Sequence, residues 1–334
     1  NKYTLQNRIN RYNVVNKALE ALSKNDCLEK DGEGYKIGNI AKLEKKIGTA
    51  SKFGTIYLTS IPNTLGSFPI ASKVMKDTTD NLLETNLMKR ITDTIILTGK
   101  SKHFAIMYKY SLCKDVKVKK KLKLVDYNEV CNGDLSALVK DRDVVSNEEH
   151  FFNILVQVFI SLATFHNSVG YVHKDTHYGN FLYQLNNETG YYHYKAGATE
   201  FYLKSCPHNM IIYDFGFSQM IENTTPQISI SLSKYIYGDY SRILSAFLGK
   251  RKGWGEFDDI PTPAFEDKII SMRNIMNNNI YYHLTGTNPS RATDYAKDLF
   301  IYMLRPLINN APTGMVLTNR PANVINSTPY LIFN

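Results

Sequence analysis

The sequence predicts an α+β protein with two lobes, in which a small antiparallel sheet with one helix precedes a larger, mainly helical part. Short β-prone runs separated by Gly, Pro, Asn and Ser fill much of residues 41–130, as is typical of antiparallel strands. After Asp134 the pattern changes to long apolar stretches at helical spacing. We therefore predict an N-terminal extension over residues 1–40, a first lobe over 41–130 and a second lobe over 131–334.

The first part of the chain alternates between helical and extended patterns. Apolar residues at near-helical spacing predict a helix over residues 8–24, and the four-residue intervals between Leu83, Leu87 and Ile91 predict another over residues 80–91. Extended segments are predicted at residues 54–59, 68–75, 103–110 and 122–127.

The second part is expected to be mostly helical. Asp134 is placed to cap a short helix over residues 135–140, and a long, largely buried helix follows over residues 148–167. A polar, Tyr-rich stretch at residues 186–206 predicts an elongated hairpin. The final third alternates helical patterns with Pro and Asn breaks.

Composition excludes wholesale disorder, because 43% hydrophobic and 12% aromatic residues in 334 supply a substantial core. The longest apolar run, residues 151–165, contains polar residues and is shorter than the roughly 20 residues that a membrane span needs, so we expect a soluble protein. The chain begins at Asn1 and not at Met, which suggests part of a longer protein and leaves a targeting segment open. Its Asn-, Lys- and Tyr-rich usage is typical of an AT-rich genome, such as that of a parasite or a large DNA virus.

The net charge of +9 favours association with nucleic acid, an anionic membrane or an acidic protein. Much of this charge lies in a lysine-rich run over residues 114–123, which is more typical of a solvated loop than of a binding site. The four cysteines, Cys27, Cys113, Cys131 and Cys206, form no C-x-x-C pair and have no histidine spacing that suggests zinc. We therefore expect a reducing, intracellular location, either cytoplasmic or nuclear, or in the virion or host cytoplasm if the protein is viral.

The strongest chemical signal is a polar loop at residues 171–182, flanked by apolar residues, that places Asp175 and Asn180 five positions apart. A carboxylate there could take a proton from a hydroxyl while the amide oxygen coordinates a metal. An apolar strand then ends near Asp214, which is followed by Phe215 and Gly216. The alternative without a function is that Asp175 is an acidic residue in a surface loop, Asn180 a turn residue and Asp214 a cap at the end of a strand.

These two motifs resemble those of the protein-kinase superfamily. His173-Lys174-Asp175 with Asn180 is similar to the H-R-D-x-x-x-x-N catalytic loop, and the D-F-G at Asp214 matches unaltered. The H-x-D-x-H-x-G-N-x-L pattern and the lack of A-P-E are similar to haspin-type kinases. The resemblance implies a bilobal kinase-like fold with ATP and Mg²⁺ as cofactors. It makes Asp175 the catalytic base and Asn180 and Asp214 the metal ligands. His177 stands where typical Ser/Thr kinases carry a Lys; it could hydrogen-bond phosphate or loop backbone, or be a purely structural histidine.

The resemblance also implies a nucleotide site. Lys73 in an A-x-K pattern would hold the α and β phosphates, with Glu84 as its ion-pair partner, and Asp239 would brace the catalytic loop from below. The expected nucleotide-contacting residues are Gly48, Thr49, Ser51, Gly54, Ile56, Ala71, Lys73, Asn128, Glu129, Val130 and Asp134. A plain β-hairpin, an ordinary surface Lys with a helix Glu, and a helix cap at Asp134 explain the same residues without a nucleotide.

Several departures from the kinase pattern leave the activity open. Thr49 and Ser51 stand where the family has glycines, and Lys174 replaces a common Arg. The main expectation is a Ser/Thr protein kinase with a protein substrate, acidic or associated with nucleic acid; a pseudokinase scaffold and a small-molecule kinase of the aminoglycoside or choline type are the alternatives. Candidate phosphorylation sites after the D-F-G are Thr224, Thr225, Ser229, Ser231 and Ser233. The oligomeric state stays open.

Overall fold

In the computed structural model of the chain, the structure describes residues 2–23, 26–51, 54–62, 69–113, 122–222, 225–248, 262–286 and 291–334, without the side chains of 49–51 and 122–123. These residues form a mixed α+β structure with two compact units. The N-terminal unit comprises Lys2–Thr98 and Ala105–Cys131, and the C-terminal unit comprises Gly99–Phe104 and Asn132–Asn334.

An antiparallel sheet of seven strands in the order β1-β2-β3-β4-β5-β7-β6 forms the body of the N-terminal unit. Its strands are β1 Leu28–Asp31, β2 Gly34–Ile37, β3 Ala41–Ser51, β4 Gly54–Ser60, β5 Ile70–Lys76, β6 Met107–Leu112 and β7 Leu122–Glu129. Gly32, with φ +60°, makes the tight turn between β1 and β2 possible. Residues 1–40 were expected to be an extension, but their described part supplies β1 and β2 to this sheet because β2 pairs with β3.

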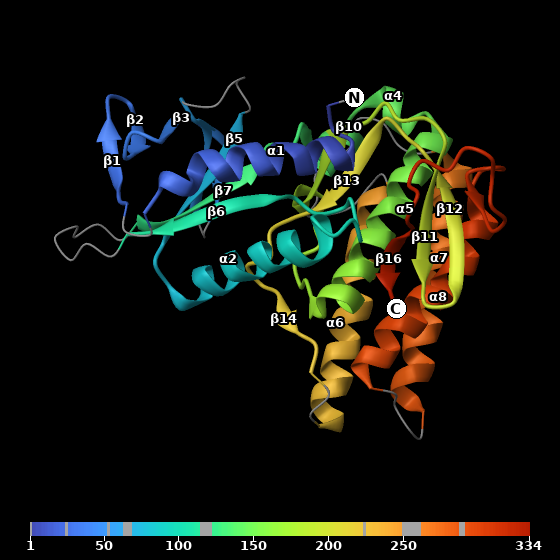
Figure 1. Cartoon of the computed structure of the whole chain (residues 1–334). Helices are drawn as coiled ribbons and strands as arrows, with labels where there is room; N and C mark the ends of the chain where they lie inside the picture. The colour runs from blue at the N-terminus through green and yellow to red at the C-terminus, as the bar shows by residue number, and fades with distance from the viewer. Residues whose placement is uncertain are drawn as a thin grey trace. The chain divides into compact units, whose positions relative to one another are not determined.

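Two helices pack along β6, as Figure 1 shows. Helix α1 spans Leu5–Ala18 and α2 spans Thr79–Ile91; each begins after a threonine, Thr4 or Thr78, whose side chain accepts a hydrogen bond from the first turn. The helix predicted over residues 80–91 is confirmed. The first helix starts earlier than predicted, because Thr4 caps it, and it gives way to a 3₁₀ turn at Leu19–Ala21.

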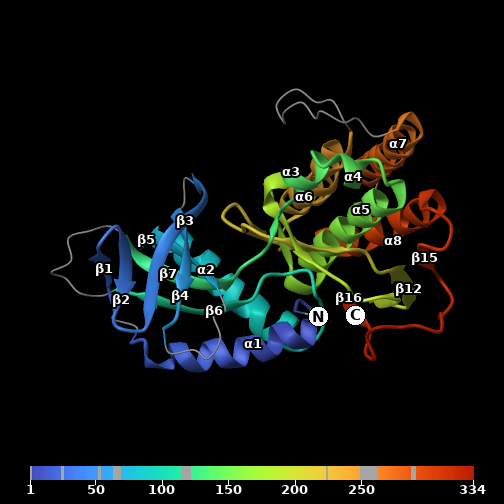
Figure 2. The same cartoon turned by 90° about the horizontal axis from the view of Figure 1, so that it is seen from above.

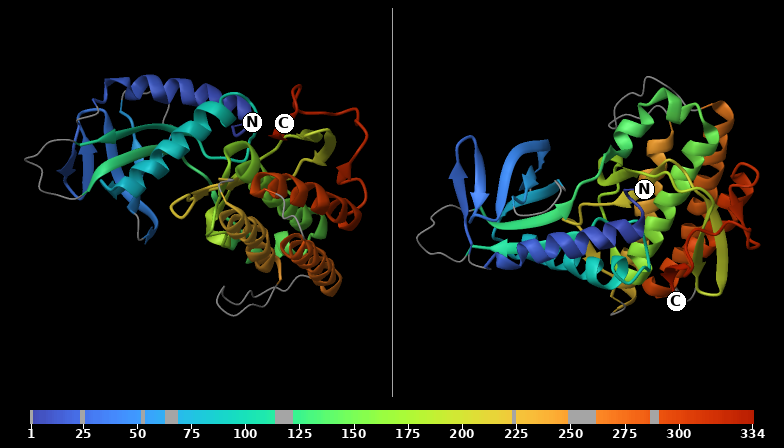
Figure 3. Two further views of the ribbon diagram at one scale, coloured as in Figure 1. Left: turned by 90° about the horizontal axis from the view of Figure 1, so that it is seen from below. Right: turned by 45° about the horizontal axis from the view of Figure 1, so that its top comes forward.

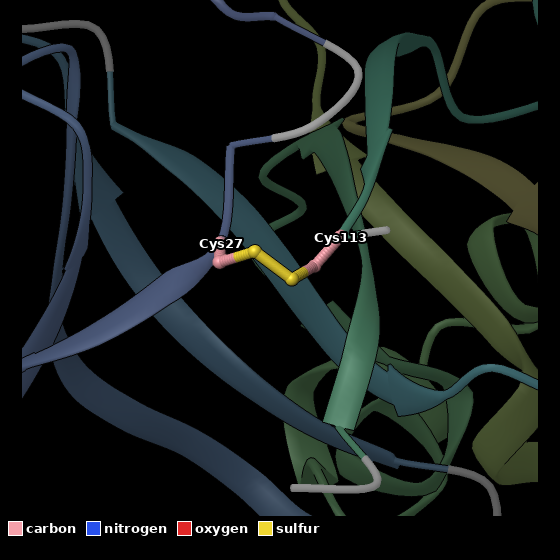
Figure 4. Close-up of a disulfide and its surroundings, with 2 residues drawn as sticks. All are labelled: Cys27 and Cys113. Atoms are coloured by element: carbon pink, nitrogen blue, oxygen red, sulfur yellow. A yellow bond between two sulfur atoms is a disulfide. The ribbon is translucent and has the colours of Figure 1, made fainter. Parts of the chain in front are cut away.

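A disulfide between Cys27 and Cys113 joins residues 86 positions apart (Figure 4). Cys27 directly precedes β1 and Cys113 directly follows β6, and these are the two edge strands of the sheet. The sheet must therefore curl until its edges meet. Cysteine spacing did not predict this bond. Disulfides persist mainly in oxidising compartments. The reducing, intracellular location that the sequence suggested therefore stays a prediction.

The core of the C-terminal unit is helix α5, Glu148–Thr164, in which every residue from position 151 to 164 is buried. A π turn at Phe165–Val169 extends it, and Gly170 ends it with φ +86°. The combined segment Glu148–Val169 is long and apolar enough to be a candidate membrane span, but 89% of its most apolar window is buried inside the protein. That burial is typical of a core helix. Figure 2 shows α6, Pro226–Leu244, and α8, Ala292–Asn310, beside it.

The C-terminal unit contains further helices and several small sheets. The helices are α3 Leu135–Val139, α4 Arg142–Val145 and α7 Pro263–Thr285. One small sheet has the order β13-β10-β8, with β8 Gly133–Asp134, β10 Phe181–Leu185 and β13 His208–Ile212. Another has the order β15-β12-β11-β16, with β11 Tyr191–Ala196, β12 Thr199–Lys204, β15 Val316–Leu317 and β16 Tyr330–Phe333. Strands β9 Tyr171–Val172 and β14 Gln219–Met220 pair with each other.

The hairpin predicted over residues 186–206 is confirmed as β11 and β12. The C-terminal strand β16 runs parallel to β11, and Figure 3 shows this red segment beside the yellow hairpin. The end of the chain thereby completes a sheet that begins more than 100 positions earlier.

Candidate functional site

The loop between β9 and β10 brings Asp175 and Asn180 into direct contact. The Asn180 Nδ2 atom donates to the main-chain oxygen of Asp175 at 2.8 Å and to its Oδ2 atom at 3.2 Å. Asn180 is buried, whereas the Asp175 side chain keeps 20% of its surface exposed. The amide nitrogen thus fixes the carboxylate, and a reacting hydroxyl could still approach it.

Asp239, on α6, holds this loop from inside the unit. Its Oδ2 atom accepts from the main-chain nitrogen of His173 at 2.8 Å, and its Oδ1 atom accepts from that of Lys174 at 2.8 Å. The Nε2 atom of His166 lies 2.7 Å from Oδ2, and the Thr176 hydroxyl donates to the Asp239 main-chain oxygen at 2.7 Å. Asp239 is only 2% exposed, so the predicted brace is confirmed as a buried set of hydrogen bonds.

Asp214 reaches the same loop through the small sheet. Strand β13 pairs with β10, and just beyond that pairing the main-chain nitrogen of Tyr213 donates to the main-chain oxygen of Asn180 at 2.9 Å. The His173 ring also contacts this segment, with its Nε2 atom 2.9 Å from the main-chain oxygen of Tyr213. Asp214, the next residue, therefore lies beside the loop that carries Asp175 and Asn180, within one unit.

Lys174 and Asp214 are the non-glycine residues with positive φ in the described part of the chain, at +70° and +59°. Such a conformation costs on the order of 1–3 kcal/mol and persists only where its surroundings impose it. Here Asp239 holds Lys174, and the Asp214 Oδ1 atom accepts from the nitrogen of Gly216 at 3.2 Å. Backbone strain of this kind concentrates at functional sites, and here Lys174 directly precedes Asp175 while Asp214 is itself a predicted metal ligand.

His177 and Arg242 both face the Asp175 carboxylate. The Nη1 atom of Arg242 lies 3.3 Å from Asp175 Oδ1, and the Nε2 atom of His177 lies 3.6 Å from Oδ2. Burial lowers the pKa of His177 below its ordinary value, although the carboxylates of Asp175 and Asp214 partly oppose this. The His177 Nδ1 atom accepts from the Gly179 nitrogen at 3.1 Å, so the neutral ring carries its proton on Nε2, toward Asp175.

Arg242 was not among the site residues predicted from the sequence. Its signal was available, because Arg242 lies three positions after Asp239 on one helix, and residues at that spacing share a face. A guanidinium beside Asp175, the predicted base, stabilises the ionised carboxylate and supplies a fixed positive charge at the site.

A second polar cluster lies in the N-terminal unit. The predicted ion pair forms, with Lys73 Nζ 3.6 Å from Glu84 Oε1 and both side chains at least 95% buried. Asp126 lies opposite Lys73 on the neighbouring strand and accepts from its main-chain nitrogen at 3.3 Å. It was not among the site residues predicted from the sequence. Burial raises the pKa of Asp126 to about 7, and the charge of Lys73 only partly offsets this.

Glu129, one of the predicted nucleotide-contacting residues, has partners within its own unit. Its main-chain nitrogen donates to the oxygen of Ile106 at 2.9 Å, and its buried carboxylate receives Arg8 from α1, with both oxygens 3.2 Å from Arg8 Nε. Asn128 donates through Nδ2 to Asp126 at 2.8 Å. The Glu129 amide is thus unavailable to a nucleotide, while Val130 follows the end of β7.

The other predicted nucleotide positions have local structural roles. A Cβ atom on Gly54 would lie 2.7 Å from the main-chain oxygen of Val74, so close backbone packing requires glycine there. Ile56 pairs with Lys73, Ala71 pairs with Asn128, and Gly48 has φ +70°. The side chains of Thr49 and Ser51 lie outside the described residues.

Asp134 caps α3, as predicted, by accepting from the Ala137 nitrogen at 3.1 Å. Its expected contact with a nucleotide stays a prediction.

Most of the candidate phosphorylation sites after the D-F-G lie in or next to a helix. Helix α6 begins at Pro226, capped by the Thr225 hydroxyl. Ser233 is fully buried and Ser229 Oγ accepts from the nitrogen of Ala292 at 2.9 Å, so neither is an open phosphorylation site. Thr224 and most of the lysine-rich run at residues 114–123 lie outside the described residues.

Comparison with models of known protein families and with curated protein sequences finds no match. The kinase resemblance therefore rests on the sequence motifs.

Proposed function

We propose that the protein is a phosphotransferase of the protein-kinase type, which transfers the γ-phosphoryl group of ATP to a Ser or Thr hydroxyl of a protein. The main support is the convergence of Asp175, Asn180 and Asp214, which come from two separate segments of the sequence. A base, an amide and an acid around one strained loop meet the needs of metal-assisted phosphoryl transfer.

The donor set suits magnesium, since carboxylate and amide oxygens are hard ligands. Asn180 and Asp214 would hold the ion, which would neutralise charge on the nucleotide phosphates. Asp175 would orient the acceptor hydroxyl and take its proton. Its other neighbours, Arg242 and neutral His177, would keep the carboxylate ionised and correctly turned.

Arg242 takes over, in this proposal, the positive charge that typical Ser/Thr kinases carry on a lysine two positions after the catalytic aspartate. In this chain that position is His177, and burial lowers its pKa, which favours the uncharged ring. Lys73, held by Glu84, would bind the α and β phosphates. The kinase-like bilobal fold is part of the same proposal.

A small-molecule kinase is the second candidate, and one observation favours it. Only nine residues separate Gly216 from Pro226 at the start of α6. A segment that short leaves little chain for a peptide-docking platform. A catalytically silent scaffold finds less support, because Lys73, Asp175, Asn180 and Asp214 are all present.

A single screen separates these functions. Radiolabelled ATP with Mg²⁺ is offered together with histone or casein, and separately with sugars, choline and nucleosides. We expect label on protein, and a loss of several orders of magnitude in the Asp214→Asn variant, because charge stabilisation dominates this chemistry.

The matched control is Asp267→Asn, which removes an exposed carboxylate on α7. Full activity in Asp214→Asn contradicts the proposal. Label on a small molecule alone selects the second candidate, and thermal stabilisation by Mg-ATP without any transfer selects the scaffold.

A further inference from the structure

Two histidines and one cysteine meet in the C-terminal unit, away from the residues of the candidate functional site. His150 lies in the first turn of α5, Cys206 lies between β12 and β13, and His208 opens β13. One ligand atom from each, an imidazole nitrogen or the sulfur, lies within 4.8 Å of the other two. Cys206 is a free, buried cysteine.

Neighbouring residues fix the orientation of the two imidazoles. The Nε2 atom of His150 lies 2.8 Å from the Nδ1 atom of His208, and the rings stack with centroids 4.8 Å apart. The ring of Tyr183 packs edge-on against His208 at 4.9 Å. The side chain of Asn147 caps α5 at the main-chain nitrogen of His150, which holds the first turn in place.

Cys206 and His208 are also held by their own backbone. The main-chain nitrogen of His208 lies 3.5 Å from the Cys206 sulfur, and Gln157 donates through Nε2 to the His208 main-chain oxygen at 2.9 Å. Gln157 belongs to α5, so β13 is tied to the same helix that carries His150. The three ligand-bearing segments therefore have little freedom to separate.

We propose that His150, Cys206 and His208 bind one Zn²⁺ ion. One thiolate and two imidazoles are ligands that zinc prefers, whereas Mg²⁺ and Ca²⁺ prefer oxygen. Tetrahedral zinc places such atoms about 3.3–3.6 Å apart, given metal–ligand distances of about 2.0–2.3 Å. The ion would take the place of the His150–His208 hydrogen bond after shifts of about 1 Å.

A pocket of about 210 Å³ opens beside this cluster, with His150 and Cys206 in its wall together with Asn147, Asn153 and Ser205. It gives the ion a route of entry and room for water in the fourth position. The described residues that line it include no methionine, which is the usual weak axial ligand of copper sites with two histidines and a cysteine.

Zinc binding would restrain β13, the strand that begins at His208. Strand β13 leads directly to Tyr213 and Asp214, so an ion here would clamp the N-terminus of α5 to the segment that carries a predicted metal ligand of the candidate functional site. The zinc site itself does not depend on the proposed phosphotransfer.

Cobalt substitution tests the site. Metal-free protein, prepared with a chelator, is titrated with Co²⁺ while the thiolate-to-cobalt charge-transfer absorption is followed, and Zn²⁺ is then added as competitor. We expect one equivalent of Co²⁺, displaced by one equivalent of Zn²⁺. Cys206→Ser should lose the charge-transfer band, and His150→Ala should weaken binding at least about 100-fold, since loss of a merely supporting group already costs 10–100-fold.

Cys131→Ser removes the other free cysteine and is the matched control, with binding expected to stay unchanged. Because Cys206→Ser could impair folding, His208→Gln provides a second variant, and far-UV circular dichroism checks each protein. Absence of the band in the wild type, its persistence in Cys206→Ser, or undiminished affinity in both histidine variants overturns the proposal. So does uptake of Cu²⁺ without Zn²⁺ or Co²⁺.

Discussion

Replacing Asp239 with asparagine keeps the size of the side chain but removes its charge and one acceptor oxygen. The carboxylate accepts from the main-chain nitrogens of His173 and Lys174 and lies 2.7 Å from the His166 ring. An asparagine oxygen can serve the Oδ2 side, where two of these groups meet. Its amide nitrogen must then face the Lys174 N–H, donor against donor.

The size of the effect follows from these contacts. A hydrogen bond to a charged acceptor contributes about 1.5–3 kcal/mol, and leaving a partly buried donor unpaired costs about 1–3 kcal/mol. The lost bond also releases Lys174 from its positive φ, which recovers part of the strain. We therefore expect the free energy of unfolding to fall by about 2–4 kcal/mol.

Urea unfolding at pH 7, followed by far-UV circular dichroism, measures this change. Asp267→Asn, an exposed aspartate on α7, is the control and should stay within about 0.5 kcal/mol of the wild type. If Asp239→Asn unfolds at the same urea concentration as the control, Asp239 does not hold the loop in the way that its contacts indicate.

Two further predictions concern buried charges of the N-terminal unit. Arg8→Ala leaves the Glu129 carboxylate buried without its arginine partner, so the free energy of unfolding should fall by about 3–5 kcal/mol. Urea unfolding measures this change, and an unchanged value would exclude a stabilising role for the pair. Asp126 has a folded-state pKa of about 7 against an ordinary value of 3.8, so the folded protein binds more protons between these pH values and its stability should decrease as pH rises from about 4 to 7. The difference of about three pH units corresponds to at most about 4 kcal/mol. Urea unfolding from pH 4 to 8 should show a flatter profile for Asp126→Asn, and parallel profiles for the two proteins would contradict the assigned pKa.

Local patterns predicted the elements whose signals lie within a few residues. The helix over residues 80–91 has a regular apolar face, and the hairpin over residues 186–206 lies in a polar, Tyr-rich stretch. Asp134 was correctly predicted as a helix cap because capping depends on the next three residues. The ion pair between Lys73 and Glu84 was expected from the resemblance to kinases and not from a local pattern.

Long-range partners could not be predicted in this way. Arg8 meets Glu129 across 121 positions because α1 packs along β6, the neighbour of β7. Cys27 meets Cys113 across 86 because the curled sheet brings its two edges together. Nothing in the neighbourhood of either residue specifies its partner. The His150, Cys206 and His208 cluster was missed for the same reason, since its ligand spacing is not that of a familiar zinc motif.

Phosphoryl transfer by the Asp175→Asn variant is the most direct test of the proposed function. At saturating Mg-ATP and with the best acceptor from the screen, the variant should be slower than the wild type by about 10²–10⁴-fold, the contribution of a positioned general base. Its affinity for Mg-ATP should change only a few-fold, because Asp175 is not a proposed metal ligand. Equal transfer rates in two folded proteins would contradict the assignment of Asp175 as the catalytic base.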